Sequence, residues 1–190
     1  MSIQIPGAKR SFLHPSSRSF VQQALFVVAG TLVLAVASKI AVPMVPVPIT
    51  MQTFAVTMIG ALYGWRLGSL TVLAWLGEAM MGLPVLAGTS TGLAPFVGPT
   101  AGYLIAFPLM VAMVGLLTEK GADGRRPVSA FLLHLAANVL CLALGWAWLA
   151  GVVGAQAAWI AGVAPFVIGA ILKSALAAAA LVAIRGRTAK

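Results

Sequence analysis

One lysine inside an apolar run is the side chain of this sequence with the clearest chemical potential. Lys173 lies about 11 residues into the last such run, or roughly 16 Å along a helix. A charge at that depth in a membrane is costly and is by default a sign of function. An anion beside it would offset the cost, because burial disfavours the charged ammonium. That anion is either the carboxylate of a ligand or Glu78, which lies within another apolar run. A lysine that faces lipid and snorkels to the surface is the third possibility.

Other polar and aromatic side chains within the apolar runs are candidates for ligand contacts. An ionised Glu78 would accept hydrogen bonds from N–H groups, either of a ligand or of a neighbouring loop. Asn138 and His134 are four residues apart and so share one face of a helix. They either join neighbouring helices through hydrogen bonds or contact a ligand. Tyr103 lies near the end of a run, where aromatic belts meet the membrane surface, and its ring could also stack on a flat ligand.

The sequence lacks the residue combinations that are typical of enzymes. It has neither a phosphate-binding G-x-x-x-x-G-K-[ST] loop nor an H-E-x-x-H zinc motif. Two of its three carboxylates, Glu119 and Asp123, share one polar turn and provide no acid–base pair for hydrolysis. A lone cysteine, Cys141, excludes a disulfide within the chain and a cysteine metal site. We therefore predict a protein that binds and passes a molecule without transforming it, and we predict no cofactor and no metal.

The composition places the chain in a membrane. Of its 190 residues, 61% are hydrophobic and 8% are charged, against about 45–50% and about 25% in ordinary soluble domains. A span needs roughly 20 apolar residues, and runs and breaks give six candidates. These cover residues 20–38, 50–63, 67–81, 100–117, 128–149 and 162–184. We predict an all-α protein with six transmembrane helices in residues 20–184, a tail at 1–19 and a second tail at 185–190.

The basic residues orient these spans. The net charge is +9, but the charges lie at the ends of apolar runs and not on one face interleaved with aromatics, so nucleic acid is not the expected partner. The positive-inside rule puts both termini in the cytoplasm. On that arrangement ten of the twelve basic residues are cytoplasmic: Lys9, Arg10, Arg18, Arg66, Lys120, Arg125, Arg126, Arg185, Arg187 and Lys190.

Two outer loops, at residues 39–49 and 82–99, are long, nearly uncharged and rich in proline, glycine and threonine. Backbone at membrane depth must find hydrogen-bond partners in the protein or in a water-lined cavity. We expect both loops to fold over or into the outer mouth of the bundle and to cap a ligand cavity there. The alternative is that they are plain connectors.

Several of these stretches carry a family resemblance. PVPITMQT lies at residues 46–53 and GALYGWRLG at 60–68. GLPV at 82–85 and GPTAGY at 98–103 follow, and PFVIGAILK lies at 165–173. Over about residues 20–184 the chain resembles the BioY family, the substrate-binding S-components of energy-coupling factor (ECF) biotin transporters. The resemblance implies a six-helix bundle in the bacterial cytoplasmic (inner) membrane that captures biotin for uptake. It also implies two kinds of partner, a transmembrane coupling protein and ABC-type ATPase subunits.

The resemblance also suggests how biotin would be bound. Lys173 suits the valerate carboxylate, and Tyr103 is an aromatic candidate for the bicyclic ring. The family commonly has an aspartate one turn before this lysine, where the chain has Ala170. The ureido group would then need other partners, and the candidates are Glu78, Asn138 and the hydroxyls of Thr89, Ser90 and Thr91. The departure leaves open a related transporter for another small carboxylate-bearing ligand.

Overall fold

Long apolar helices account for most of the chain, as the runs of the sequence predict. The structure is a computed structural model that describes residues 19–122 and 126–188. Five of the helices described there are long and apolar enough to cross a membrane. They are α1 (Phe20–Lys39), α2 (Gln52–Met80), α4 (Ala101–Glu119), α5 (Pro127–Val153) and α7 (Phe166–Thr188). Two short helices, α3 (Ala94–Val97) and α6 (Ala155–Gly162), lie between them.

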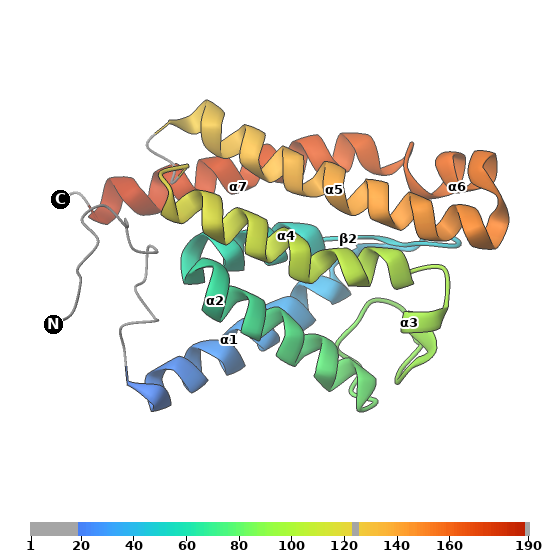
Figure 1. Ribbon diagram of the computed structural model, residues 1–190, viewed down its shortest axis with the longest axis horizontal. Helices are drawn as coiled ribbons and strands as arrows, with labels where there is room; N and C mark the ends of the chain where they lie inside the picture. Colours follow the sequence, from blue (N-terminus) through green and yellow to red (C-terminus); the bar gives the residue numbers. More distant parts are fainter. Residues whose placement is uncertain (1–18, 123–125, 189–190) are drawn as a thin grey trace, which may run out of the picture.

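The second helix reverses direction at one glycine. Gly64 has φ 78° and ψ 175° inside α2, a conformation that essentially only glycine adopts. A Cβ built on Gly68 would lie 3.4 Å from the Cα of Gly60, although eight residues of straight helix span about 12 Å. The two halves of α2 therefore fold back on each other, as Figure 1 shows. The break falls between the predicted runs 50–63 and 67–81, and α2 covers all but the first two residues of the one and the last residue of the other.

The reversed α2 packs against α4 at the centre of the molecule. A Cβ on Gly115 of α4 would lie 2.4 Å from the backbone nitrogen of Trp65, so a glycine is required where α4 meets the turn. The same backbone N–H donates to Glu119 Oε1 at 3.2 Å. Deeper in the core, the rings of Trp75 and Phe107 stack with centroids 5.8 Å apart. These contacts join α2 and α4 along their length.

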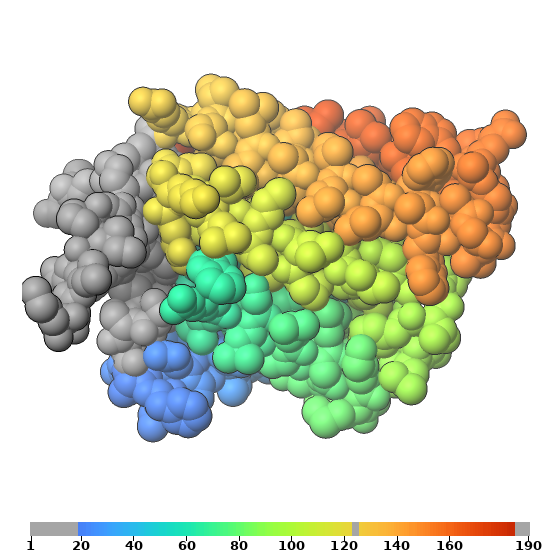
Figure 2. All heavy atoms as spheres, in the orientation of Figure 1, coloured from blue at the N-terminus to red at the C-terminus, as the bar shows by residue number. Residues whose placement is uncertain are grey.

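The outer helices expose apolar side chains. Only five residues of α1 are buried: Gly30, Thr31, Leu34, Ala37 and Ser38. Its exposed face carries leucines and valines, and α1 lies at the edge of the molecule in Figure 2. α5 and α7 likewise turn leucines, isoleucines and valines outward. Lipid is the solvent that accepts such a surface, because its tails are as apolar as the side chains.

The connections gather at two ends. The reversal within α2, the end of α4, the start of α5, the start of α1 and the end of α7 lie at one end in Figure 1. At the other end the first loop (residues 40–51) forms a two-stranded antiparallel ribbon of β1 (Ala41–Val42) and β2 (Ile49–Thr50). The second loop (residues 81–100) contains α3 and lies at the same end as α6.

The last predicted span begins later than the sequence suggested. α5 ends at Val153, and after Gly154, whose φ is 87°, residues 155–162 form α6. α7 then starts at Phe166, directly after Pro165. Proline has no backbone N–H to give to a helix interior, so it limits the helix that follows it. The predicted start at residue 162 was wrong for this reason.

Candidate functional site

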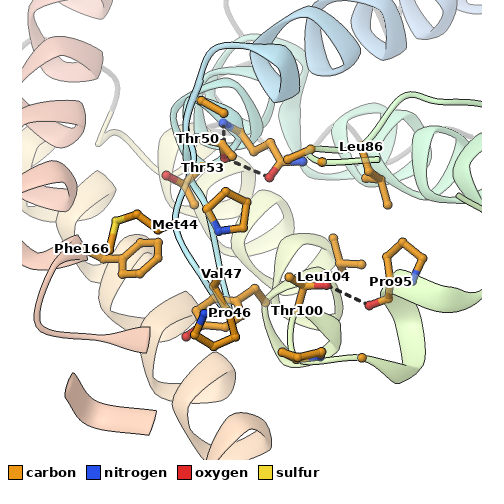
Figure 3. Close-up of a pocket in the computed structure, with 18 of the residues that line it drawn as sticks. Met44, Pro46, Val47, Thr50, Thr53, Leu86, Pro95, Thr100, Leu104 and Phe166 are labelled. Atoms are coloured by element: carbon orange, nitrogen blue, oxygen red, sulfur yellow. Dashed lines mark hydrogen bonds between the residues drawn. The ribbon is translucent and has the colours of Figure 1, made fainter. Parts of the chain in front are cut away.

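A cavity of about 720 Å³ lies where the two loops meet the helix bundle. Its size is within the range of small-molecule sites, about 300–1,000 Å³. Residues 43–48 of the first loop and 86–90 of the second line it, together with side chains of α4, α5 and α7. Figure 3 shows Thr50 and Thr53 on one side, with Phe166 and Leu86 on opposite walls. Both loops thus contribute walls, as their composition predicted, and are not plain connectors.

Lys173 projects from α7 into this cavity. Its Nζ donates to the Thr50 backbone carbonyl at 2.6 Å and to Thr53 Oγ1 at 3.3 Å. Both acceptors are uncharged. Lys173 and Glu78 both belong to the described part of the chain, and their side chains form no ion pair there. An ammonium has three donors, so the third hydrogen of Lys173 remains for a partner in the cavity. Because Lys173 lines the cavity, the lipid-facing alternative is wrong.

A buried hydrogen-bond network holds the strand that carries Thr50. Thr50 Oγ1 donates to Gln52 Oε1 at 2.9 Å, and Gln52 Nε2 donates to Ser38 Oγ at 3.0 Å. Gln52 and Ser38 are 7% and 0% exposed. The network joins the first loop to the end of α1 and fixes the carbonyl that Lys173 contacts. Sequence reasoning did not single out these residues, although the TMQT segment at 50–53 was part of the resemblance.

The second loop is fastened to the bundle near both of its ends. Trp75 Nε1 donates to the Val85 carbonyl at 3.1 Å, and Lys39 Nζ donates to the Leu86 carbonyl at 2.8 Å. At the far end, Trp148 Nε1 donates to the Gly98 carbonyl at 3.0 Å. These contacts place residues 86–90 against the cavity. Trp148 therefore helps to hold the end of the second loop.

An aromatic wall closes another side of the cavity. The rings of Tyr103 and Phe166 are nearly parallel, with an interplanar angle of 25° and centroids 6.3 Å apart. The Tyr103 hydroxyl donates to the Gly162 carbonyl at 2.8 Å. A Cβ on Gly145 would lie 2.2 Å from the Tyr103 ring, so α5 needs a glycine there. Tyr103 is therefore held from two sides where it lines the cavity.

Asn138 lies at the junction of α5 and α7 and lines the cavity. Its Nδ2 donates to the His134 carbonyl at 2.9 Å and to Ser174 Oγ at 3.2 Å. His134 is one turn away and 0% exposed. Its ring nitrogens have no hydrogen-bond partner within residues 19–122 and 126–188, and its side chain does not line the cavity.

The structure brings five of the seven predicted site residues together around the cavity. They are Thr89, Ser90, Tyr103, Asn138 and Lys173. Glu78 and Thr91 do not line it. α2 contributes only Gln52 and Thr53 to the lining, so the half of α2 that carries Glu78 stands away from the cavity. Thr91 is exposed, beyond Gly88 with φ 77°.

The site also includes residues that sequence reasoning did not predict. Cys141 and Ala170 line the cavity from α5 and α7, and Thr53 does so from the start of α2. Cys141 was expected to have neither a disulfide nor a metal role, and its side chain is 2% exposed. Cys141 lies three residues after Asn138 and so on the same helix face. This spacing is the sequence feature from which its place in the cavity lining could have been predicted.

Three comparisons place these features among known proteins. The model of the BioY family matches residues 9–190. A protein of Pyrococcus horikoshii described as "Probable biotin transporter BioY" is 39% identical over 153 residues, which cover 80% of this chain and 90% of the relative. A "Biotin transporter BioY" of Rhizobium etli is 36% identical over 171 residues, covering 86% and 90%.

A solved structure has the same fold. It is the crystal structure at 2.1 Å of the S-component for biotin from an ECF-type ABC transporter. It superposes with a TM-score of 0.77 at 25% identity and covers 87% of this chain and 92% of its own. The helices and loops described above thus follow the architecture of that S-component.

Proposed function

The chain belongs to the BioY family, and from this premise we propose that it is the membrane-embedded subunit that captures biotin for uptake by an ECF-type importer. The observation that carries the proposal is the loop-capped cavity with Lys173 in its wall. Biotin has an anionic carboxylate, an apolar bicyclic body and a polar ureido group. The cavity offers one cation, an apolar lining and a small number of polar groups, which is the usual composition of a selective small-molecule site.

In this proposal Lys173 binds the carboxylate of biotin. Its two protein acceptors are neutral, so the charge of the ammonium is not yet compensated by them. A carboxylate that accepts the third N–H forms a charge-assisted hydrogen bond, which is roughly twice as strong as a neutral one. Phe166, Leu104 and the first-loop prolines would contact the ring system.

Binding of biotin to the purified protein in detergent is the experiment that tests the function. Isothermal calorimetry should detect saturable binding, and biotin should raise the unfolding temperature because it binds only the folded state. Pentanoate, which has the carboxylate without the rings, is the matched control and should bind far more weakly. Absence of binding at millimolar biotin would refute the proposal.

A related transporter for another small carboxylate-bearing ligand is the second candidate. One observation favours it: Ala170 lies in the cavity wall where the family commonly has an aspartate. Lipoate, which shares the valerate but has no ureido group, separates the two candidates. Tighter binding of lipoate than of biotin would favour the second candidate, and the reverse order would favour biotin.

We further propose six membrane crossings with both termini in the cytoplasm of a bacterial inner membrane. The reversal at Gly64 supports counting the halves of α2 as two crossings. Arg66 follows the reversal in α2, Lys120 follows α4 and Arg126 precedes α5. These parts of the helices lie at the end opposite the two loops in Figure 1, in agreement with the positive-inside rule. The variants Ser90→Cys and Lys120→Cys, each made in a Cys141→Ser background, test this topology by reaction with a membrane-impermeant maleimide in intact cells. Ser90→Cys should be labelled directly, and Lys120→Cys only after permeabilisation.

Energy for transport would come from partner proteins. The sequence has no phosphate-binding loop of its own, and the matching structure is the S-component of an ECF-type ABC transporter. We propose that a transmembrane coupling protein and ABC-type ATPases assemble with this chain. Uptake of radiolabelled biotin by cells that carry the chain alone, or with those partners, measures the dependence.

A further inference from the structure

The orientation of the Asn138 amide is fixed by a backbone carbonyl. Amide oxygen and nitrogen are assigned from the hydrogen-bond network, and here the network leaves one solution. The His134 carbonyl lies 2.9 Å from the Asn138 amide, and a carbonyl can only accept. The atom that faces it must therefore be Nδ2, and Oδ1 must lie on the other branch of the amide.

Ser174 holds the same amide from α7. Its hydroxyl donates to the Ala170 carbonyl at 2.7 Å, so its proton is used and its oxygen can only accept from Asn138. Nδ2 donates to that oxygen at 3.2 Å. Ser174 is 0% exposed. Both Nδ2 hydrogens thus have partners on α5 and α7, and rotation of the amide would break both bonds.

The carbonyl oxygen of Asn138 is left open to the cavity. Among the described side chains of residues 19–122 and 126–184, no donor contacts Oδ1, and Oδ1 is not among the buried polar atoms that lack both a partner and solvent. The side chain is 3% exposed, and it lines the cavity. An acceptor in such a place requires a donor from whatever fills the cavity, since a buried acceptor without a partner is costly.

We propose that Asn138, positioned by Ser174, selects the ligand by accepting a hydrogen bond from one of its N–H groups. The inference rests on the proposed function and identifies that group as a ureido N–H of biotin. Lys173 reaches Thr50 and Thr53 at the start of α2, whereas Asn138 is held by α5 and α7. The cavity thus presents a cation whose ammonium contacts Thr50 and Thr53 and an acceptor held between α5 and α7, which suits a ligand with an anionic group and an N–H group.

The Asn138 acceptor would also compensate for the lack of a hydrogen-bonding side chain at Ala170. An alanine side chain has no hydrogen-bonding group, so position 170 leaves the ligand's N–H without a partner on that turn of α7. Asn138 contacts Ser174, one turn from Ala170, and supplies a neutral acceptor on the same wall. Sites built to hydrogen-bond a ligand N–H reject analogues that lack it, because the site's polar group is then left unpaired.

The test uses two analogues of biotin in which a ring oxygen replaces one or the other ureido N–H. They keep the shape and the carboxylate of biotin and remove one donor each. Calorimetry with the wild-type protein should show one analogue binding about 10- to 100-fold more weakly than biotin. Asn138→Leu should weaken biotin itself and reduce that preference to less than about threefold.

Two further variants separate selection from folding. Asn138→Asp keeps acceptor oxygens but loses both Nδ2 hydrogen bonds that hold the side chain, so it should lower the preference for the N–H. Ser174→Ala frees the amide and should lower the preference, while leaving intact the preference for biotin over biotin amide, which depends on Lys173. Thr71→Val, a buried change outside the cavity lining, is the control and should change neither preference.

The outcomes distinguish this inference from the proposed function. Wild-type protein that binds no biotin would refute the proposed function. Wild-type protein that binds biotin, with an N–H preference that survives Asn138→Leu, would overturn the role of Asn138 alone. An N–H preference that survives Ser174→Ala unchanged would overturn the positioning role of Ser174.

Discussion

Replacement of Lys173 by methionine is the most direct test of how the carboxylate is bound. Methionine keeps an unbranched, flexible side chain and removes the charge. The wild-type ammonium already has two protein acceptors, at 2.6 and 3.3 Å, and has one hydrogen left for the ligand. Hydrogen bonds to charged groups contribute about 1.5–3 kcal/mol. Since about 1.4 kcal/mol corresponds to a tenfold change in affinity, Lys173→Met should weaken biotin binding about 10- to 150-fold.

The ligand provides the matched half of the experiment. Biotin amide lacks the negative charge and should bind the wild-type protein more weakly than biotin by a similar factor. If Lys173 and the carboxylate contact each other, the Lys173→Met protein should bind biotin and biotin amide about equally. Titration calorimetry of the four combinations gives a double-mutant cycle, which isolates the pairwise contribution.

The variant also removes a contact to the first loop, and this effect needs a separate control. Thr53→Val removes one neutral acceptor of Lys173 and leaves the charge in place, so it should keep the preference for biotin over the amide. A Lys173→Met protein that still preferred biotin by tenfold would show that the carboxylate binds elsewhere. The lysine would then serve to hold Thr50 in the first loop.

Two glycines give predictions about the fold. Gly64→Ala should lower the free energy of unfolding by about 1–3 kcal/mol, because φ 78° with ψ 175° is strained for any residue with a Cβ. The control is Gly77→Ala, where a Cβ meets nothing within 4 Å, and it should leave the free energy of unfolding unchanged or raise it. Equal effects of the two substitutions in thermal unfolding would refute the argument. Gly145→Ala should cost about 1–3 kcal/mol by overpacking and weaken biotin binding, because its Cβ would lie 2.2 Å from the Tyr103 ring. Gly151→Ala places its Cβ in open space and should lower neither stability nor biotin affinity in the same calorimetric assay. Equal losses in the two variants would count against a role for Tyr103 in the cavity wall.

Much of the fold was predictable because hydropathy and glycine–proline breaks are local properties of a sequence. The predicted run 20–38 corresponds to α1 (Phe20–Lys39) within one residue, and 100–117 lies within two residues of α4 (Ala101–Glu119). The break between 63 and 67 was predicted from the turn residues around Gly64. The start of α7 was missed because Gly162 to Ala164 are as apolar as a helix interior, and only the position of Pro165 decides where the helix can begin.

The site was predictable in its loops and in its lysine, but not in its other polar contacts. Charge at membrane depth singles out Lys173 without any structure. Glu78 has the same signal and is not in the cavity lining, because the reversal of α2 leaves only Gln52 and Thr53 of that helix in the wall. Spacing along a chain does not say which half of a reversed helix faces a cavity. The contact between Lys173 and the Thr50 carbonyl was not predictable either, because every residue has a backbone carbonyl and the sequence does not mark the one that is used.

The charge balance of the cavity connects capture of a ligand with its stabilisation of the protein. In the part of the chain that the structure describes, Lys173 has neutral acceptors and no acidic partner. A cation at membrane depth is costly without a counter-charge, so the empty protein carries that cost. A carboxylate ligand removes it, because the complex of ammonium and carboxylate is neutral overall and its charges are hydrogen-bonded to each other. In the proposed binding mode Asn138 Oδ1 is the second group that contacts the ligand, because it would accept a hydrogen bond from an N–H of that ligand. Lys173 and Asn138 together thus recognise the ligand in this binding mode, and a ligand that lacks either the carboxylate or the N–H would leave one of these groups without its partner.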